Sequence, residues 1–323
     1  MLPTLKIAHM LPKLPIIQGG MAVRVSTGKL AAAVANAGGI GTIGGTGMTP
    51  EELSREIRTA KGLSTGYIGV NVLFAAKEFA ELMLTAMREK VDFVVSGAGF
   101  SRDMFTWGKE RGIPVLAIVS SARLAKLAEK MGAAAVVVEG KEAGGHLGTD
   151  RPIADIIPEV ISEVQIPVIA AGGITDGEDI ARMLQLGAAG VQMATRFVMS
   201  DECEAHPDFK DKYLKASAED ITLIQSPVGL PGRAIRNQFT QKIAGEGSKP
   251  IEKCERCLKH CSAKFCILES LRRAVTGDVT DGLVFSGEFV HRIKDILPVQ
   301  DIMNNLSQQL EQALYKIKAS TII

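Results

Sequence analysis

The sequence predicts an α/β fold: a (β/α)8 TIM barrel with a C-terminal, cysteine-bearing elaboration. Eight short apolar runs recur between residues 14 and 195, and their starts lie 21 to 32 residues apart, with a helix-like stretch between successive runs. This alternation indicates βα units and a parallel sheet. Each run is apolar throughout, as expected of strands that are covered on both faces. An open doubly wound sheet is the alternative, but eight units favour a closed barrel.

The individual elements follow from the same pattern. Runs rich in β-branched residues predict strands at Leu14–Gly19, Ile40–Gly44, Tyr67–Leu73, Asp92–Ser96, Ile113–Ser120, Ala134–Glu139, Ile166–Ala171 and Gly190–Thr195. The stretches between them predict helices at Thr27–Ala37, Pro50–Lys61, Lys77–Lys90, Arg102–Arg111, Ser121–Met131, Ile153–Val164 and Asp176–Leu186. The barrel is therefore expected within residues 1–199.

The rest of the chain follows a different pattern. Residues 200–295 show no βα rhythm and hold all five cysteines, so we expect an insertion or lid packed on the barrel. Residues 296–323 form a tail, and a helix is predicted over Val299–Ala319 because apolar residues recur there every three or four positions. These residues are Ile302, Leu306, Leu310, Leu314 and Ile317. We expect this helix to cover the barrel or to meet a second subunit in a homodimer.

Composition excludes several classes of protein. Hydrophobic residues make up 46% of the 323 residues, which excludes disorder as the dominant state. The net charge of +1 argues against a nucleic-acid partner. Apolar runs such as 113–119 are far shorter than the roughly 20 residues of a membrane span. Residues 1–15 lack the apolar core of a secretion signal. We therefore expect a cytoplasmic protein without disulfides.

Glycines gather where the predicted strands end. They occur at Gly19–Gly20, Gly44–Gly45, Gly97, Gly140 and Gly172–Gly173. In a barrel the carboxyl ends of the strands share one rim, and that rim carries the active site. Glycine lets a flat cofactor or a phosphate approach the main chain. Tight βα turns could account for one or two of these glycines, but so many on one rim favour a ligand.

One histidine lies on this predicted rim. His146 follows the sixth strand within the glycine-rich loop 139–148. Because an imidazole titrates near neutral pH, a histidine there can serve as a general acid or base. The alternative is a loop histidine that caps a backbone carbonyl. We favour a catalytic or ligand-contacting His146.

The loops after the last two strands predict a phosphate site. Barrels commonly bind phosphate there, and the N–H groups of Gly172, Gly173 and Ala194, with the Thr195 hydroxyl, could hold a dianion at a helix N-terminus. Together with the glycine-rich first strand, this implies a flat phosphorylated cofactor, for which FMN is the candidate. The amide of Asn71 can donate to and accept from a flavin edge, although it could instead fix a turn.

These motifs in this order resemble the nitronate monooxygenase superfamily, also called the 2-nitropropane dioxygenase-like family, which includes the flavin-dependent enoyl-acyl-carrier-protein reductase II enzymes. The matching motifs are Gln18-Gly19-Gly20-Met21, Gly69-Val70-Asn71, Glu139-Gly140-x-x-Ala143-Gly144-Gly145-His146, Ala170-Ala171-Gly172-Gly173-Ile174 and Gln192-Met193-x-Thr195-Arg196-Phe197. The resemblance spans about residues 10 to 295. It implies an FMN-binding barrel that uses His146 at the flavin face.

The resemblance also implies roles for individual residues. Gly20 and Met21 would lie beside the flavin, and Asn71, Gly144 and Gly145 close to its ring. Glu139 would join the cofactor-binding residues. Gly172, Gly173, Gln192, Met193, Ala194 and Thr195 would surround the phosphate. Ala194 stands where the family usually has glycine, and an alanine there needs a negative φ.

A cysteine cluster predicts a metal site. Cys254, Cys257, Cys261 and Cys266 follow the pattern C-x2-C-x3-C-x4-C. Four thiolates suit a [4Fe–4S] cluster or structural zinc, and the compact spacing favours iron–sulfur. Metal-free thiols are a further alternative. The fifth cysteine, Cys203, is expected to be a packed thiol.

The cysteine segment is also similar to an iron–sulfur-containing branch of the superfamily, the acyl-carrier-protein dehydrogenase/isomerases. The similarity extends through residues 219–235 and 282–287. Six basic residues lie nearby: Lys253, Arg256, Lys259, Lys264, Arg272 and Arg273. They could form a docking face for an acidic acyl carrier protein or a solvated helix face partly neutralised by glutamates.

These features predict an FMN-dependent oxidoreductase that acts on an acyl thioester, for which acyl carrier protein is a candidate carrier. The reaction would be enoyl reduction with NAD(P)H as donor, or acyl desaturation or isomerisation with another acceptor. His146 would move a proton beside the thioester carbonyl or polarise that group. A nitronate monooxygenase that oxidises alkyl nitronates with O2 is the alternative. A flavin and iron–sulfur redox sensor without turnover is a third hypothesis.

Overall fold

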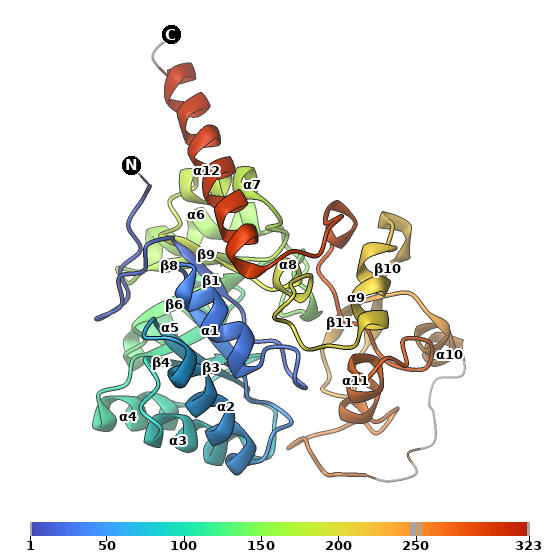
Figure 1. Cartoon of the computed structure of the whole chain (residues 1–323). Coiled ribbons are helices and arrows are strands. Elements are labelled where there is room, and N and C mark those ends of the chain that lie inside the picture. Colours follow the sequence, from blue (N-terminus) through green and yellow to red (C-terminus); the bar gives the residue numbers. More distant parts are fainter. Residues whose placement is uncertain (1, 246–250, 252–253, 322–323) are drawn as a thin grey trace.

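The chain folds around a parallel eight-stranded barrel (Figure 1). The computed structural model describes residues 2–245, 251 and 254–321. Its barrel strands are β1 (Ile16–Gln18), β2 (Gly41–Gly44), β3 (Ile68–Leu73), β4 (Phe93–Gly97), β5 (Val115–Val119), β6 (Ala135–Glu139), β8 (Val168–Ala171) and β9 (Gly190–Met193). The strand order β1-β9-β8-β6-β5-β4-β3-β2 and a parallel bridge between Ile17 and Ile40 bring the two ends of the sheet together. The predicted (β/α)8 barrel is confirmed.

Helices between the strands cover the outside of the barrel. They are α1 (Gly28–Asn36), α2 (Pro50–Leu63), α3 (Phe79–Arg88), α4 (Arg102–Arg111), α5 (Ala122–Met131), α6 (Ile153–Glu163) and α7 (Gly177–Gln185). Helix α2 shows why these segments become helical where they do. A capping box between Thr49 and Glu52 satisfies the first free N–H groups, and Pro50 occupies the first turn, where it needs no donor.

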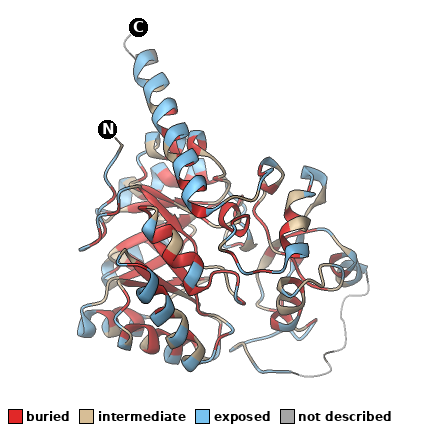
Figure 2. Cartoon of the chain, viewed as in Figure 1, coloured by how far each residue is buried: buried red, intermediate tan, exposed pale blue. Residues whose placement is uncertain are grey.

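Two apolar layers flank each strand, which explains why the strands are apolar throughout. Along β6, Ala135 and Val137 belong to the cluster inside the barrel, whereas Val136 and Val138 belong to the cluster beneath the helices. Residues of the N-terminal segment, among them Leu5 and Ile7, join the inner cluster. Figure 2 shows the result: buried strands, and helices exposed only on their outer faces. This double burial is typical of parallel sheets.

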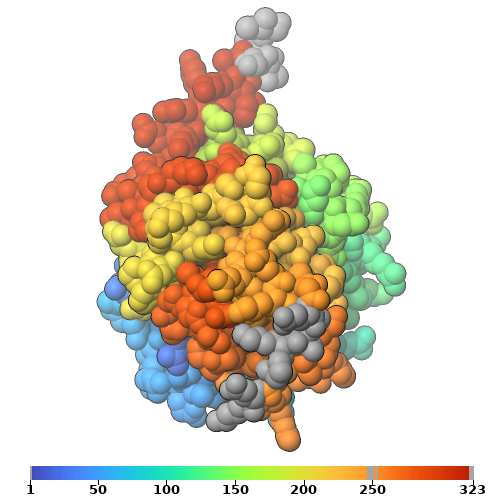
Figure 3. Space-filling model, turned by 90° about the vertical axis from the view of Figure 1, so that its right-hand side faces the viewer, coloured from blue at the N-terminus to red at the C-terminus, as the bar shows by residue number. Residues whose placement is uncertain are grey.

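The segment after the barrel adds short elements that sequence periodicity did not predict. They are α8 (Thr195–Val198), α9 (Pro207–Leu214), η1 (Ala218–Asp220), β10 (Ile221–Gln225), β11 (Pro231–Ile235), α10 (Gln238–Gly245), α11 (Ile267–Val275) and η2 (Val290–Arg292). Strands β10 and β11 form an antiparallel hairpin, and β11 also pairs with β7 (Gly145–His146), which belongs to the barrel's own β6–α6 loop. Figure 3 shows this yellow and orange segment spread over one face of the molecule.

The tail forms the predicted long helix. Helix α12 (Val299–Thr321) packs against α1 and α7 on the outside of the barrel. The Gly177 N–H, at the start of α7, donates to Gln309 Oε1 at 2.9 Å. A Cβ at Gly177 would lie 2.4 Å from the Leu310 nitrogen, so this position must remain glycine for the two helices to approach. The far end of α12 extends away from the barrel (Figure 2).

Truncation of a barrel-filling side chain tests the assignment of the inner cluster. Phe93 on β4 is 1% exposed and belongs to that cluster. We expect Phe93→Ala to lower the free energy of unfolding by about 3–5 kcal/mol, because the phenyl volume is lost from a site that cannot collapse. The control is Leu124→Ala on α5, where the side chain is 37% exposed and the expected loss is about 0.5 kcal/mol. Urea unfolding followed by circular dichroism measures both, and similar losses in both variants would contradict the assignment.

Candidate functional site

A large cavity opens at the carboxyl ends of the barrel strands. Its volume is about 980 Å³, at the upper end of the range for ligand pockets. The cavity is lined by His146 and by every residue expected to bind the cofactor: Gly20, Met21, Asn71, Glu139, Gly144, Gly145, Gly172, Gly173, Gln192, Met193, Ala194 and Thr195. The structure therefore brings together residues from the carboxyl ends of five barrel strands, β1, β3, β6, β8 and β9.

The loop after β1 carries Gly20 and Met21, and a buried serine holds its shape. Ser26 Oγ accepts hydrogen bonds from the Met21 N–H and from Gln18 Nε2, both at 2.9 Å. The Ser26 carbonyl accepts from the Gly44 N–H at 3.0 Å, which ties this loop to the end of β2. The chain at Gly20 and Met21 is thus fixed before any ligand binds.

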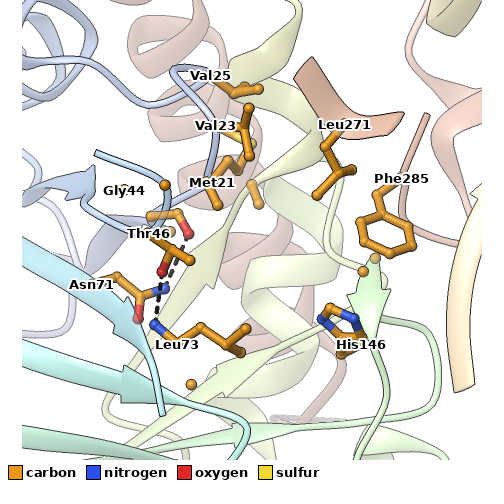
Figure 4. A pocket seen from close by; sticks show the side chains of 18 of the residues that line it. Met21, Val23, Val25, Gly44, Thr46, Asn71, Leu73, His146, Leu271 and Phe285 are labelled. Atoms are coloured by element: carbon orange, nitrogen blue, oxygen red, sulfur yellow. Dashed lines mark hydrogen bonds between the residues drawn. The ribbon is translucent and has the colours of Figure 1, made fainter. Parts of the chain in front are cut away.

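Asn71 presents an unsatisfied acceptor in the cavity wall. Its Nδ2 donates to the Gly20 carbonyl at 3.0 Å, as Figure 4 shows. Its Oδ1 is buried and has no hydrogen-bond partner among the described residues. A buried polar atom left unpaired costs free energy. This oxygen therefore suits a ligand that offers an N–H donor, such as the edge of a flavin ring.

His146 lies in β7, and the hairpin that follows the barrel holds it in place. In the antiparallel register, His146 faces Gly232 of β11. Its ring packs edge-on against Phe285 with centroids 5.3 Å apart, and its Nε2 lies 2.8 Å from Ser226 Oγ. Burial lowers the pKa of His146 to about 4, because a charged imidazole would lose its hydration there. The ring is therefore neutral at physiological pH.

The pKa of Glu139, at the end of β6, is shifted in the opposite direction to that of His146, and burial is again the cause. Burial raises the pKa of its carboxyl to about 8. At neutral pH the carboxyl is mainly protonated, so it can donate a hydrogen bond to a ligand as well as accept one. At neutral pH, therefore, the Glu139 carboxyl is mainly uncharged and the His146 ring is uncharged, so neither places a full charge in the cavity.

The turns after β8 and β9, where the sequence predicts a phosphate site, both line the cavity. Gly172 and Gly173 have φ of +106° and +69°, a left-handed conformation that glycine adopts without strain. Ala194 has φ −122°, the negative value that an alanine needs at this position. Thr195 begins α8, and its Oγ1 accepts from the Gly287 N–H at 3.0 Å, so the segment after the barrel also supports this wall.

The cysteine segment lies against the rim of the barrel. The Lys77 N–H donates to the Cys257 carbonyl at 3.0 Å, and an antiparallel bridge joins Ala76 to Leu258. Cys257 lines the cavity, and burial, followed by the neighbouring Cys266 thiol, raises its pKa to about 11. The Sγ atoms of Cys254 and Cys261 each accept a backbone N–H two residues later, both at 3.4 Å.

The described residues show no preformed metal site. Across residues 2–245, 251 and 254–321, no group of three or more His, Cys, Asp or Glu side chains is placed to hold a metal. The metal site therefore stays a prediction from spacing. Cys203 is buried, and its thiol lies 3.6 Å from the Val25 carbonyl, consistent with packing.

The basic residues near the cysteines are largely engaged within the chain. Arg272 pairs with Glu255 and Glu269, and Arg273 pairs with Asp278. The Lys259 ammonium lies 3.9 Å from the centre of the Phe74 ring. Lys253 lies outside the described residues. These contacts favour a solvated helix face that is partly neutralised by glutamates over a docking face for an acidic protein.

Sequence reasoning assigned no role to several residues that shape the site. Ser226 and Phe285 contact His146 directly. Arg233 donates to the carbonyls of Lys141 and Ala143, at 2.6 and 3.1 Å, and so fastens the loop that carries His146. These residues follow the barrel and belong to no periodic pattern, so only the motif around Ser226 could have drawn attention to them.

The raised pKa of Glu139 predicts a distinct pH dependence of stability. In the unfolded chain this carboxyl releases its proton near pH 4.5, whereas the folded protein retains it to about pH 8. Its contribution to the free energy of unfolding therefore falls as pH rises across that window. Relative to wild type, flavin-free Glu139→Gln should gain stability by about 1 kcal/mol per pH unit. Urea unfolding at several pH values measures this, and parallel wild-type and variant curves would contradict it.

Comparison with known proteins places the chain in a family. The model of the nitronate monooxygenase family matches residues 4–309. The structure of FabK from Thermotoga maritima superposes with a TM-score of 0.87 at 35% identity and covers 96% of each chain. A probable nitronate monooxygenase of Staphylococcus aureus is 29% identical and covers 93% of this chain and 95% of its own.

A further relative acts on a coenzyme A thioester, according to its name. It is the (3aS,4S,5R,7aS)-5-hydroxy-7a-methyl-1-oxo-octahydro-1H-indene-4-carboxyl-CoA dehydrogenase of Rhodococcus jostii, 34% identical over 72% of this chain. That alignment spans 66% of the relative's length, slightly less than two thirds. The family model and the overall superposition, unlike this partial match, extend over nearly the whole chain. The chain belongs to the nitronate monooxygenase family.

Proposed function

We propose that this protein is an FMN-dependent oxidoreductase that acts on an acyl thioester. One observation carries the proposal: His146 and the twelve residues expected to hold FMN line a single cavity of about 980 Å³. The unpaired Asn71 Oδ1 and the left-handed Gly172–Gly173 turn fit a flat, phosphorylated ligand. Bound FMN would supply the two-electron redox chemistry that the side chains lack.

The residues divide into those that would hold the phosphate and those that would hold the ring. Gly172, Gly173, Ala194 and Thr195 would surround the phosphate, because they form adjoining turns at the ends of neighbouring strands. Asn71, Gly20 and Met21 would lie along the ring, with Gly144 and Gly145 on the side of His146. The Ser26 hydrogen bonds keep the β1 loop in place for this purpose.

A group of apolar side chains also lines the cavity and supports an acyl substrate. Figure 4 shows Val23, Val25 and Leu271 gathered at the end of the cavity away from His146. Leu258, Ile267, Leu268 and Val275 line the same region. An alkyl chain would bury apolar surface against these side chains at about 25 cal/mol per Å². A small nitronate would not require this space.

His146 would act at the carbon beside the thioester carbonyl. Its lowered pKa keeps the ring neutral, with one nitrogen able to accept a proton and the other able to donate a hydrogen bond. It can therefore move the proton at that carbon or polarise the carbonyl oxygen. The name of the Rhodococcus jostii relative agrees with such a substrate, since a carboxyl-CoA is a thioester.

Nitronate oxidation is the second candidate, supported by the family model and by the Staphylococcus aureus relatives. The same flavin cavity and His146 would serve it. The apolar end of the cavity favours the thioester, and the relative rates of the two substrate classes distinguish the proposals.

We also propose that the four clustered cysteines bind a [4Fe–4S] cluster. Their spacing and the backbone N–H···S contacts to Cys254 and Cys261 support this, since metal thiolates accept such bonds. Among the described residues no group of three or more possible ligands is placed to hold a metal, and no step of the reaction is assigned to the cluster. A cytoplasmic homodimer and use of acyl carrier protein remain predictions. None of the described helices is both long and apolar enough to cross a bilayer.

The visible spectrum of anaerobically purified protein tests the flavin first. We expect flavin bands that bleach when NADH is added if the enzyme is a reductase. Bands that persist with NADH and bleach with a saturated acyl thioester would instead indicate a dehydrogenase. Protein purified with FMN present that shows no flavin bands would overturn the proposal.

Substitution of the histidine tests its role. His146→Gln should retain the flavin spectrum and lower kcat by about 10²- to 10⁴-fold with enoyl thioesters, because the acid–base or polarising group is lost. Steady-state rates with thioesters and with alkyl nitronates provide the measurement. Higher wild-type turnover of nitronates than of any thioester would favour the second candidate.

Metal analysis tests the cysteines. Anaerobic wild-type protein should contain iron and acid-labile sulfide, and Cys257→Ser should lose both. Cys203→Ser is the matched control and should retain them, because Cys203 lies outside the cluster. Zinc in place of iron, or equal iron in both variants, would contradict the iron–sulfur proposal.

A further inference from the structure

The side chain that controls the tautomer of His146 lies outside the barrel. Ser226 follows β10, is 4% exposed and does not line the cavity, so it sits behind the imidazole. Its Oγ lies 2.8 Å from His146 Nε2. Either group could donate in this contact, and the choice decides which ring nitrogen carries the proton.

The other contacts of Ser226 decide the direction of the bond. The Val228 N–H donates to Ser226 Oγ at 3.3 Å, so one lone pair of this oxygen is occupied. The hydroxyl hydrogen needs an acceptor, since a buried donor without one is costly. Within the described residues, His146 Nε2 is the acceptor that lies in reach. The serine is fully satisfied only when it donates to Nε2.

The hairpin holds both partners at the distance this bond requires. Ser226 starts a tight turn in which the Gly229 N–H donates to the Ser226 carbonyl at 3.0 Å. The returning strand β11 pairs with β7, and the Leu147 N–H donates to the Pro231 carbonyl at 2.9 Å. Phe285 packs against the ring from another side. The imidazole therefore cannot turn away without breaking contacts on both strands.

The opposite nitrogen of the ring is open to the cavity. His146 Nδ1 makes no hydrogen bond within the described part of the chain. The atom is not fully buried, so a ligand in the cavity can reach it. Figure 4 shows the ring projecting into the cavity across from Leu73 and Asn71. With Nε2 occupied by Ser226, the proton of the neutral ring sits on Nδ1.

We propose that Ser226 is a positioning residue that fixes His146 as the Nδ1–H tautomer, so that His146 donates a hydrogen bond to the substrate's carbonyl oxygen rather than accepting a proton from carbon. The identity of that oxygen rests on the proposed function. Of the two roles given there for His146, proton transfer at carbon and polarisation of the carbonyl, this proposal assigns the second. The low pKa of His146 agrees with it, because the ring stays neutral while it donates.

Nitrogen NMR of the flavin-loaded protein tests the tautomer without any turnover. With all five histidines labelled with ¹⁵N in the ring, the His146 signals are those absent from His146→Gln. We expect a protonated Nδ1 and an unprotonated Nε2 in wild type. Ser226→Ala should shift these signals toward the other tautomer, and Ser226→Thr, which keeps the hydroxyl, should restore them. A protonated Nε2 in wild type, or wild-type signals in Ser226→Ala, would overturn the proposal.

Kinetics with an enoyl thioester give an independent readout. Ser226→Ala should lower kcat by about 10- to 100-fold, the usual scale when a bond that orients a functional imidazole is lost, with little change in KM. Ser226→Thr should recover most of the rate. Thr240→Ala removes another buried hydroxyl from the same part of the chain, outside the cavity lining, and should leave kcat unchanged. Equal losses of kcat in Ser226→Ala and Thr240→Ala would show that Ser226 has only a structural role.

The two assays separate failure of this proposal from failure of the proposed function. If the protein binds flavin but turns over no thioester, the substrate assignment fails while the NMR result still decides the tautomer. If thioesters are turned over and the NMR signals show a protonated Nε2, the function stands and Ser226 does not set the tautomer. Loss of folding in Ser226→Ala leaves the wild-type signals and the threonine variant as the deciding measurements.

Discussion

The pairing of β7 with β11 is the interaction on which the site depends. A loop of the barrel would otherwise carry His146 on glycine-rich backbone with few constraints of its own. The two-residue strand β7 gains a partner only from the chain that follows the barrel. Arg233, on that partner strand, binds two carbonyls of the same loop. The segment after residue 199 thus contributes to the cavity wall, and in the barrel alone the loop that carries His146 would lack these contacts.

The low dielectric constant around Glu139 and His146 determines which protonation state each side chain adopts. The same burial that raises the pKa of Glu139 lowers that of His146, because in both cases the charged form is the one disfavoured. At Glu139 and His146 the cavity therefore offers neutral hydrogen-bonding groups rather than charges. Such surroundings strengthen hydrogen bonds to a polarised carbonyl. They also suit a flavin ring and an acyl chain, both of which are largely apolar.

The barrel could be predicted from sequence because its strands are covered on both faces and four of the seven helices between them, α2, α4, α5 and α7, start with a side-chain cap. All eight predicted strands and seven helices occur within a few residues of the expected bounds, for example Arg102–Arg111 for α4. The rim residues could be predicted because parallel strands share one carboxyl edge. Ser226 and Phe285 could not, because their placement depends on a hairpin whose register is set by contacts far away in sequence. The cysteine spacing predicted a metal site, but spacing alone cannot show whether the sulfurs converge.

The β7–β11 pairing also has a consequence for how the protein is made. Gly232 lies 86 residues after its partner His146 in the chain. During synthesis the barrel strands leave the ribosome well before the hairpin, and N-terminal parts of a chain generally fold first. The barrel strands are therefore all made while the loop that carries His146 is still unpaired. This loop gains its partner strand only when more than two thirds of the chain has been synthesised.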